Sequence, residues 1–387
     1  MPIQLGVDQL LSTMPDIIRG RRVGLISNYT AVDGELYSTI DRFLSCSEFR
    51  LTTLFGPEHG VKNCAREGEP VAFEMDAHSR LPAYSLYGDT KKPTASMLDQ
   101  VDVFVLDLQD IGSRYYTNMN TMALAMAAAA EHHKPFLVLD RPNPIGGIRQ
   151  EGNILQSEFR SFVGGGPMPN RHGMTMGELA RWFYRIEGLD LELHVMTMRG
   201  WKRSMDFEHT QLSFVSPSPN TTHVDMAMLY PGLCLFEGTN LSLGRGTTHP
   251  FEVVGAPFID GHELARSFNQ KKLAGVHARP TYFVPRSSPF QGELCGGVQL
   301  HIIDRPRFQP VRSGISLMAV LQERYPDDFT ILPKVGGKPS FFQLLAGCAE
   351  LEQWLKDGPE TAGDRYLDQN TREWQMFRDQ FEDVRLY

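Results

Sequence analysis

A glutamate and a histidine stand side by side in a short segment bounded by glycines, Gly56-Pro57-Glu58-His59-Gly60. Glycines permit a tight turn that brings the backbone close to a ligand. A carboxyl group in such a loop can act as a general acid or a nucleophile when its neighbours tune its pKa, and His59 could assist proton transfer. Glu58 could equally cap the element that follows, so residue type alone leaves catalysis and capping open.

Polar groups also follow three other strand-like segments. Ligands of open α/β sheets bind outside the carboxyl ends of the strands, so we expect these groups to share one sheet edge with Glu58. They are Asn28, Asp110, Arg114, Asp140, Arg141 and Asn143. Two structural alternatives stay open. Asp110 and Arg114 could form an ion pair across one helical turn, and the prolines on either side of Asn143 could simply make a rigid turn.

A second group of candidates lies further along the chain. Arg171 and His172 precede a capping-box pattern, Thr175 to Glu178, and so lie near a helix N-terminus, where anions are favoured. Glycine-rich segments beyond residue 215 are rich in groups suited to sugar hydroxyls, although they could be mere connections. The candidates in them are Asn220, Glu237, Asn240 and Arg245.

Motifs for several other chemistries are missing. The segment around Arg245 lacks the GxxxxGK[ST] pattern of a phosphate loop, and no GxGxxG follows a strand. HExxH and GxSxG are absent too. We therefore expect neither a nucleotide nor a metal cofactor.

The elements that must position these residues alternate in the first half of the chain. Buried strands are predicted at residues 22–27, 51–55, 101–108 and 135–139, with a possible fifth at 191–196. Helices are predicted at 37–45, 121–133 and from 175 to about 188. Such alternation predicts an α/β fold with a parallel sheet and helices on both faces.

Beyond about residue 200 the composition changes. Gly, Pro and Ser become frequent, a strand is predicted at 298–303, and helices are predicted at 313–325, 341–357 and 371–384. We therefore expect two domains, residues 1–200 and a smaller α+β domain at 201–387, with a boundary uncertain by some fifteen residues.

Composition narrows the class of protein. The 387 residues are 41% hydrophobic and 22% charged, as in a folded globular chain. The net charge of −8 argues against a nucleic-acid partner. No stretch reaches the roughly 20 apolar residues that cross a bilayer, and residues 1–11 do not resemble a secretory signal. Five scattered cysteines without a C-x-x-C pair favour reduced thiols in a cytoplasmic protein and make a zinc site improbable.

Several long segments together resemble one known family. They are RVGLISN, LFGPEHG, LDLQDIGSRYYT, LDRPNPIGG, RHGMTMGELA, SPSPN, YPGLCLFEGTNLSLGRGT and PFEVVGAPFID, within residues 20 to 260. The chain thus resembles the family catalogued as domain of unknown function 1343, the NamZ-type exo-β-N-acetylmuramidases of bacterial peptidoglycan recycling. The resemblance implies a Rossmann-like N-terminal domain, a smaller C-terminal domain and an active cleft between them. It also implies removal of terminal N-acetylmuramic acid from the non-reducing end of peptidoglycan fragments, without metal or nucleotide.

The resemblance also assigns residues. Glu58 matches the glutamate of the family's GPEHG motif. The positions that match motifs expected to line the cleft are Arg141, Asn143, Arg171, His172, Glu237, Asn240 and Arg245. The chain departs from the family pattern at Val61-Lys62, where many members have Arg-Gly, and at Thr221-Thr222, where Met-Pro is usual. These departures bear on the substrate subtype. The lack of a signal peptide points to recycling of imported fragments.

The resulting hypothesis is hydrolysis of an amino-sugar glycoside by a pair of carboxyl groups, Glu58 with Asp110 or Glu237. An arginine should clamp the muramic lactyl carboxylate, and the candidates are Arg114, Arg141, Arg171 and Arg245. Two alternatives are an amidase or esterase acting on the lactyl-peptide side, and a non-catalytic muropeptide-binding protein. The sequence predicts neither the stereochemical outcome nor the natural aglycone nor the oligomeric state.

Overall fold

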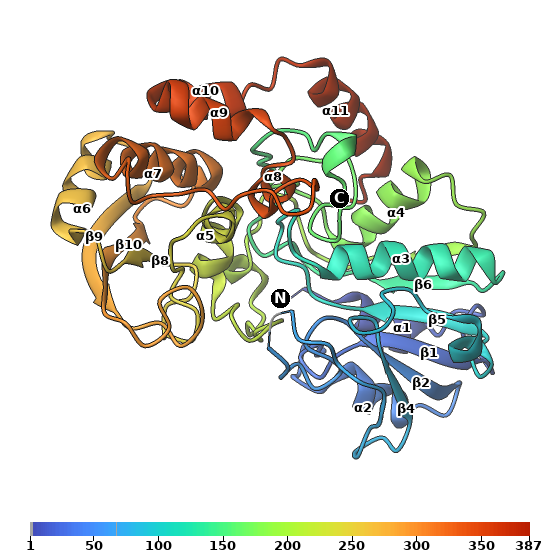
Figure 1. Cartoon of the computed structure of the whole chain (residues 1–387). Helices are drawn as coiled ribbons and strands as arrows, with labels where there is room; N and C mark the ends of the chain where they lie inside the picture. The colour runs from blue at the N-terminus through green and yellow to red at the C-terminus, as the bar shows by residue number, and fades with distance from the viewer. Residues whose placement is uncertain (1–2, 67) are drawn as a thin grey trace.

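The computed structural model describes residues 3–66 and 68–387, and its first domain is built on a seven-stranded sheet (Figure 1). The strand order is β3-β4-β2-β1-β5-β6-β7, and every neighbouring pair is parallel except β3 with β4. The strands are β1 (Arg22–Ser27), β2 (Arg50–Gly56), β3 (Glu74–Met75), β4 (Pro82–Ser85), β5 (Val103–Asp107), β6 (Phe136–Leu139) and β7 (Leu193–Met196). The helices of this part are α1 (Gly6–Thr13), α2 (Thr39–Leu44), α3 (Asn118–Glu131) and α4 (Met176–Ile186).

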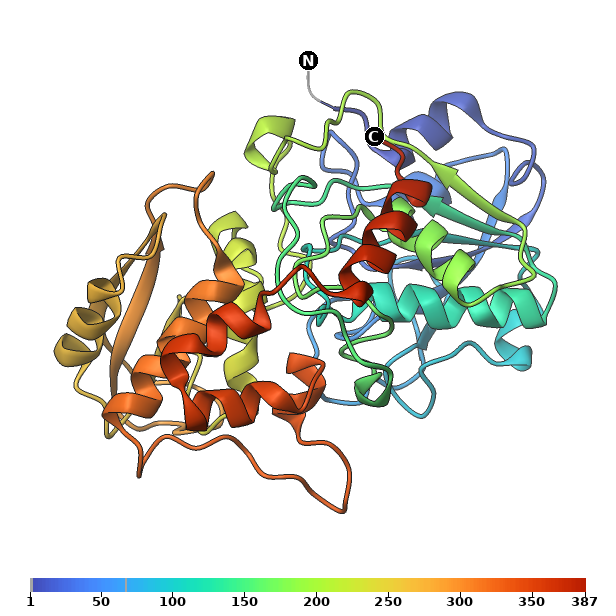
Figure 2. The same cartoon turned by 90° about the horizontal axis from the view of Figure 1, so that it is seen from above.

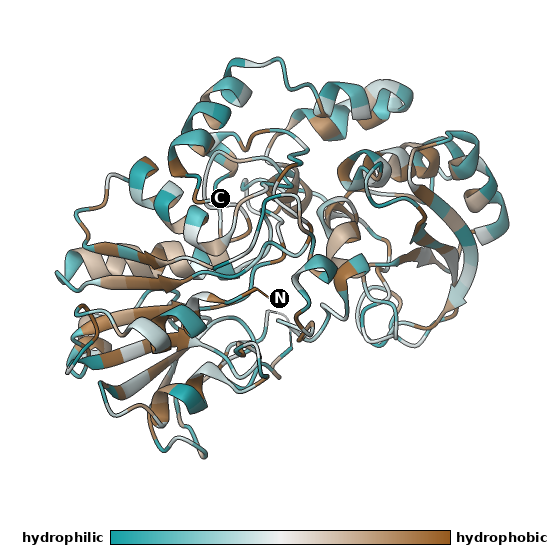
Figure 3. Ribbon diagram, turned by 180° about the vertical axis from the view of Figure 1, so that it is seen from behind, coloured by the Kyte–Doolittle hydropathy of each residue, from teal (hydrophilic) through white to brown (hydrophobic). Residues whose placement is uncertain are grey.

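Successive side chains of the central strands enter two different cores. In β5, Phe104 and Leu106 pack in the core that contains residues of α3 and α4, whereas Val103 and Val105 pack in the core that contains residues of α1 and α2. A strand buried on both faces needs apolar residues at every position, because successive side chains point to opposite faces. Figure 3 shows the resulting concentration of hydrophobic residues in the strands. The predicted Rossmann-like α/β fold is confirmed.

The second domain holds a three-stranded antiparallel sheet, β8-β10-β9, packed against helices. Alternate residues of β9 and β10, such as Val276 and Leu300, join the core that α5 and α7 complete. The elements from here to the end of the chain are α5 (Val224–Leu233), β8 (Val253–Ala256), α6 (Gly261–Gln270), β9 (Val276–Phe283), β10 (Cys295–Ile302), α7 (Pro310–Arg324), α8 (Phe341–Ala346), α9 (Glu350–Asp357), α10 (Pro359–Tyr366) and α11 (Arg372–Val384), of which α11 packs on the first domain. Short 3₁₀ turns are η1 (Ala95–Leu98), η2 (Ser157–Phe159), η3 (Glu208–Thr210) and η4 (Cys234–Gly238).

Local sequence signals predicted some details correctly and others not. The capping box forms, since Thr175 Oγ1 accepts from the Glu178 amide and Glu178 Oε2 accepts from the Thr175 amide. The single helix predicted at 341–357 is wrong, because Gly347 at φ +72° ends α8 and a separate helix, α9, follows. Helix α5 was not predicted; it contains Pro231, which normally argues against a helix.

The C-terminus returns to the first domain (Figure 2). Helix α11 packs on α4, and its Trp374, Phe377 and Phe381 belong to the core beneath the large sheet. The last helix of the chain therefore contributes to the core of the first domain, while the division at residues 1–200 and 201–387 stays a prediction.

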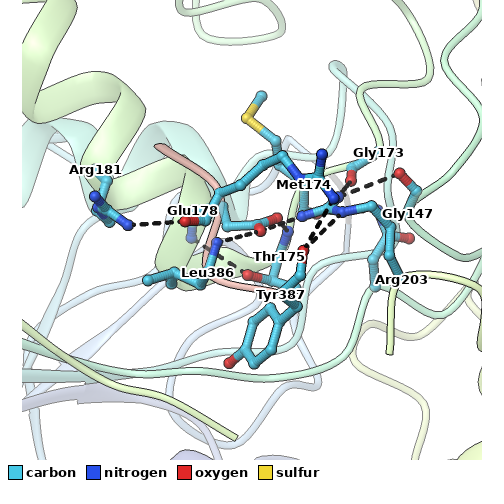
Figure 4. A network of polar contacts seen from close by, with 12 residues as sticks. Gly147, Gly173, Met174, Thr175, Glu178, Arg181, Arg203, Leu386 and Tyr387 are labelled. Carbon is cyan, nitrogen blue, oxygen red and sulfur yellow. Dashed lines mark hydrogen bonds and ion pairs between the residues drawn. The ribbon is translucent and has the colours of Figure 1, made fainter. Parts of the chain in front are cut away.

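The last residues are bound by buried polar groups of the first domain. The Leu386 amide donates to Glu178 Oε1 over 3.0 Å, and the Tyr387 hydroxyl donates to Asp140 Oδ2 over 2.7 Å. Arg203 forms an ion pair with the same Glu178 and also donates to the Tyr387 carbonyl. Figure 4 shows Glu178, Arg203 and Tyr387 gathered in this network.

Two buried charges of the first domain hold the ends of helices in the second. The Arg114 guanidinium, fully buried, donates to the carbonyls of Leu345 and Ala346 at the C-terminal end of α8. Glu151 Oε1 accepts from the Arg312 amide in the first turn of α7 over 2.8 Å. Helix ends carry unpaired backbone groups and partial charges, positive at the N-terminus and negative at the C-terminus. Arg114 therefore meets a helix end of opposite sign, and so does the Glu151 carboxyl group when it is ionised.

We expect Tyr387→Phe to destabilise the protein by about 1–3 kcal/mol, since it leaves a buried amide without an acceptor. In the native chain the Tyr387 hydroxyl both donates to Asp140 and accepts from the Met198 amide over 2.7 Å. Thermal and urea unfolding should show the loss. Tyr184→Phe, at an exposed position of α4, is the matched control. Equal stability of the two variants would contradict the anchoring role.

We also expect Glu151 to make stability depend on pH. Burial raises the pKa of Glu151 from 4.5 to about 7. Between these values the unfolded chain ionises while the folded chain keeps its proton, so the Glu151 contribution falls as pH rises from 4.5 to 7. This difference in pKa between the unfolded and the folded chain corresponds to at most about 3 kcal/mol of the free energy of unfolding.

Glu151→Gln should therefore gain stability relative to the wild type between pH 4.5 and pH 8, as measured by urea unfolding across that range. Glu158→Gln, which changes an exposed carboxyl group nearby, is the control. Parallel pH curves for Glu151→Gln and the wild type would rule this contribution out.

Candidate functional site

A cleft between the two domains contains Glu58. It has about 510 Å³ of space between its lining atoms, which includes the solvent at its mouth. The loop after β2 and the segment before α3 form one side, and the segment that joins the domains and the second domain form the other. The lining residues are Glu58, His59, Tyr115, Tyr116, Thr117, Asn118, Pro217, Ser218, Asn220, Thr221, Tyr230, Arg245 and Phe251.

The Glu58 carboxyl group is held by two hydrogen bonds. Oε2 accepts from the Thr117 hydroxyl over 2.8 Å, and Oε1 accepts from the Gly68 amide over 3.2 Å. Tyr87 lies beside it, and burial together with the Glu58 charge raises the pKa of Tyr87. The carboxyl group is thus oriented while it remains partly exposed in the cleft.

His59 is fixed in one tautomer and in a strained backbone conformation. Its Nδ1 lies 2.8 Å from the carbonyl oxygen of Ala65, and since a carbonyl only accepts, Nδ1 carries the hydrogen. In the neutral ring Nε2 is then the acceptor. The backbone has φ +72°, a left-handed conformation that costs a non-glycine residue of order 1 kcal/mol. Phe251, across the cleft, has φ +58°.

Arg245 is the cleft-lining arginine on the second-domain side. Its guanidinium donates to Glu237 Oε1 from Nε, over 2.9 Å, and from Nη2. It also lies over the Phe251 ring, 4.7 Å from the centroid. The bound carboxylate and the ring together orient the guanidinium plane, so Glu237 positions Arg245.

A row of hydroxyl groups completes the cleft. The hydroxyls of Ser218 and Thr221 are 2.8 Å apart, and the phenol of Tyr116 lies among the same lining residues. Our sequence reasoning did not select these three residues. The segments LDLQDIGSRYYT and SPSPN contain Tyr116 and Ser218, so the resemblance was the signal that could have identified them.

Of the fourteen residues predicted to form the site, the structure brings four to the cleft: Glu58, His59, Asn220 and Arg245. Asp110 and His172 lie together in the interior instead, with Nε2 of the histidine 3.3 Å from Asp110 Oδ2. The Met174 amide donates to His172 Nδ1, so Nε2 carries the hydrogen and faces the carboxylate. Oδ2 of Asp110 also accepts from the Gly112 amide over 2.6 Å.

The loop that follows β6 is buried too. Arg141 forms a two-pronged ion pair with Asp107 and lines a different, smaller pocket. Asp140 accepts from the Gly177 amide at the start of α4 over 2.7 Å, and burial raises its pKa to about 7. Asn143 donates to the Met174 carbonyl over 3.0 Å. These three side chains connect the loop after β6 to β5 and to the segment at the start of α4.

The remaining candidate residues also form hydrogen bonds within the protein. Arg114 binds the end of α8, as described above. Arg171 donates to the Ile145 carbonyl, and burial lowers its pKa to about 10. Asn28 Oδ1 accepts from the hydroxyl of Thr30 over 2.7 Å. Asn240 Nδ2 donates to the Asp328 carbonyl over 2.8 Å. Arg114, Arg141 and Arg171 do not line the cleft, so Arg245 is the candidate clamp for the lactyl carboxylate.

Metal sites and membrane-spanning helices can be assessed for the residues that the structure describes. Within residues 3–66 and 68–387, no group of three His, Cys, Asp or Glu side chains is arranged to hold a metal ion. In the same part of the chain no helix combines the length and the apolar character needed to cross a membrane.

Comparison with known proteins identifies both domains. Residues 23–225 match the family model of the N-terminal domain of exo-β-N-acetylmuramidase NamZ, and residues 228–387 match that of its C-terminal domain. The chain is 46% identical over 356 residues to the peptidoglycan β-N-acetylmuramidase NamZ of Bacillus subtilis (strain 168), an alignment that covers 92% of this chain and 85% of that protein.

Solved structures of similar proteins support the same family. A crystal structure of a DUF1343 family protein from Bacteroides fragilis NCTC 9343 superposes with a TM-score of 0.90 at 36% identity, and covers 100% of this chain and 99% of its own. A second DUF1343 protein of the same organism gives 0.78 at 29% identity with the same coverage. The chain therefore belongs to the exo-β-N-acetylmuramidase family of NamZ.

Proposed function

We propose that the protein releases terminal β-linked N-acetylmuramic acid from the non-reducing end of peptidoglycan fragments in the cleft between its domains, with Glu58 as the proton donor. The family is one of exo-β-N-acetylmuramidases, so the chain is a glycosidase. The observation that supports the residue assignment is the place of Glu58. Among the residues that the structure describes, it is the carboxylic acid that lines the cleft.

The reaction needs a proton on the leaving oxygen as the bond from C1 of the sugar to that oxygen breaks, while water supplies the new hydroxyl at C1. Glu58 is suited to give this proton because Thr117 and Gly68 orient it toward the cleft space. In the neutral form of the His59 ring, Nε2 is free of hydrogen and can accept a proton from the attacking water. The strained loop conformation holds both side chains at the same end of β2.

The two other carboxyl groups have supporting roles in this proposal. Glu237 is bound by Arg245 and so sets the orientation of that guanidinium. Asp110 faces His172 in the interior, where its charge acts on the cleft without contact with the substrate.

Arg245 is the proposed partner of the lactyl carboxylate of N-acetylmuramic acid. A planar guanidinium offers parallel donors that match a carboxylate. Its contacts with Glu237 and Phe251 hold this plane before substrate arrives, which lowers the entropy lost on binding.

The direct test uses para-nitrophenyl β-N-acetylmuramic acid with the wild type and Glu58→Gln. We expect the wild type to release nitrophenol and the variant to lose at least about a hundredfold in kcat, because the amide cannot give up a proton. Circular dichroism controls for folding. Full activity in Glu58→Gln would assign the acid elsewhere, to Asp110 or Glu237. Lactate or peptide release from muropeptides without glycoside cleavage would establish an amidase or esterase, and binding without turnover a binding protein.

A second prediction concerns Arg245→Lys. We expect kcat/KM for para-nitrophenyl β-N-acetylmuramic acid to fall about 10- to 100-fold, since lysine cannot form the two-pronged contact. The corresponding glycoside with a lactyl carboxamide should change by about twofold or less, because it carries no charge to lose. Arg286→Lys, a change at an arginine outside the residues that line the cleft, is the control. Equal losses on both glycosides would refute the clamp.

A further inference from the structure

Tyr116 stands out among the cleft residues because its hydroxyl group is buried and has no hydrogen-bond partner among residues 3–66 and 68–387. Two other buried tyrosines are satisfied: the Tyr115 hydroxyl donates to the Pro231 carbonyl, and the Tyr366 hydroxyl to the Ala346 carbonyl. A buried polar group without a partner costs about 1–3 kcal/mol. At a cleft, a ligand can supply the missing partner.

The missing partner must be an acceptor. Burial raises the pKa of Tyr116, and the carboxyl groups of Asp110 and Glu58 act in the same direction, so the phenol keeps its hydrogen at any working pH. Ser218 and Thr221 oppose this rise, although neither lies in hydrogen-bonding geometry with the phenol.

The surroundings of Tyr116 also select the kind of acceptor. The negative charge of Asp110 disfavours a carboxylate at this position, so the lactyl group does not fit. Sugar hydroxyls can pair equally well with Ser218 and Thr221, which both donate and accept. A neutral carbonyl oxygen, which only accepts, is the best match for the phenol.

The aromatic residues next to Tyr116 add a second requirement. The ring of Tyr230 meets Tyr116 edge to face, with centroids 6.3 Å apart, and packs on Phe251 at 4.7 Å. All three rings line the cleft. A hydroxyl donor next to apolar rings fits a group with both a carbonyl oxygen and a methyl group, which is the composition of an acetamido group.

From this arrangement we infer that Tyr116 donates a hydrogen bond to the carbonyl oxygen of the 2-acetamido group and thereby selects N-acetylated sugars. The inference rests on the proposed function, since it assumes that the sugar binds in this cleft. Tyr116 is in this account a specificity-determining residue.

The test measures inhibition constants of two free sugars, N-acetylmuramic acid and 2-deoxy-3-O-lactylglucose, against hydrolysis of para-nitrophenyl β-N-acetylmuramic acid. In Tyr116→Phe the constant for N-acetylmuramic acid should rise about tenfold, while that of the deoxy sugar should stay within about twofold. Tyr366→Phe is the matched control, because it removes a buried hydroxyl outside the cleft. It should lower Tm without changing the ratio of the two constants.

Equal changes of both constants in Tyr116→Phe, or no change, would overturn the inference. Wild-type protein that fails to hydrolyse the glycoside would instead overturn the proposed function. If Tyr116→Phe does not fold, the wild type can be tested with the N-thioacetyl analogue of muramic acid, whose sulfur is a weak acceptor. It should bind several times less tightly than N-acetylmuramic acid, and equal binding would count against the role of Tyr116.

Discussion

The relative position of the two domains depends on buried charges that meet helix ends across the interface. Arg114 binds the last carbonyls of α8, and Glu151 binds the first amides of α7. Burial of the Arg114 charge, and of the Glu151 carboxyl group in either form, would be costly without such partners. Because the cleft has one side in each domain, these contacts set the separation between Glu58 and Arg245. The interface therefore contributes to the geometry of the cleft.

The carboxyl ends of the strands in the large sheet lead to two different features, a structural ion pair and the cleft. The strand order changes direction between β1 and β5, the position where such folds usually bind ligands. Here Arg141 pairs with Asp107 at that point, and residues 212–215 of the segment that joins the domains line the small pocket beside it. The cleft lies one strand away from this position, at the end of β2. Glu58 and His59 follow β2 and line the cleft opposite residues of the second domain.

Left-handed backbone occurs on both sides of this cleft, as it does at several other positions such as Met14 and Phe290. His59 and Phe251 both have positive φ, which L-residues with large side chains seldom adopt. Each carries a side chain that the proposed chemistry uses: His59 beside Glu58, and Phe251 beneath Arg245. Rigid neighbours must hold such conformations in place, and this is consistent with groups that are oriented before substrate binds.

Some of this could be predicted from the sequence alone. Apolar runs located the central strands within two residues, and the Thr175–Glu178 pattern predicted a helix start, because both signals are local. The loop around Glu58 was recognisable from its glycines and from the family resemblance. The break at Gly347 is itself a local signal, because glycine often ends a helix, and the prediction of one helix at 341–357 overlooked it. Where α11 packs depends on distant residues, because its aromatic side chains complete the core of the first domain.

Which polar residues face the cleft was decided only by the tertiary structure. Arg141, Arg171 and Arg245 all stand in polar, turn-rich segments, and nothing in residue type separates them. The structure pairs Arg141 with Asp107 and buries Arg171, whereas Arg245 lines the cleft. An arginine is either a structural partner or a ligand-binding group according to what lies opposite it. The groups that bind Arg141 and Arg171 are Asp107 and the Ile145 carbonyl, which are 34 and 26 residues away in the chain. Sequence spacing therefore identifies the candidates, and packing chooses among them.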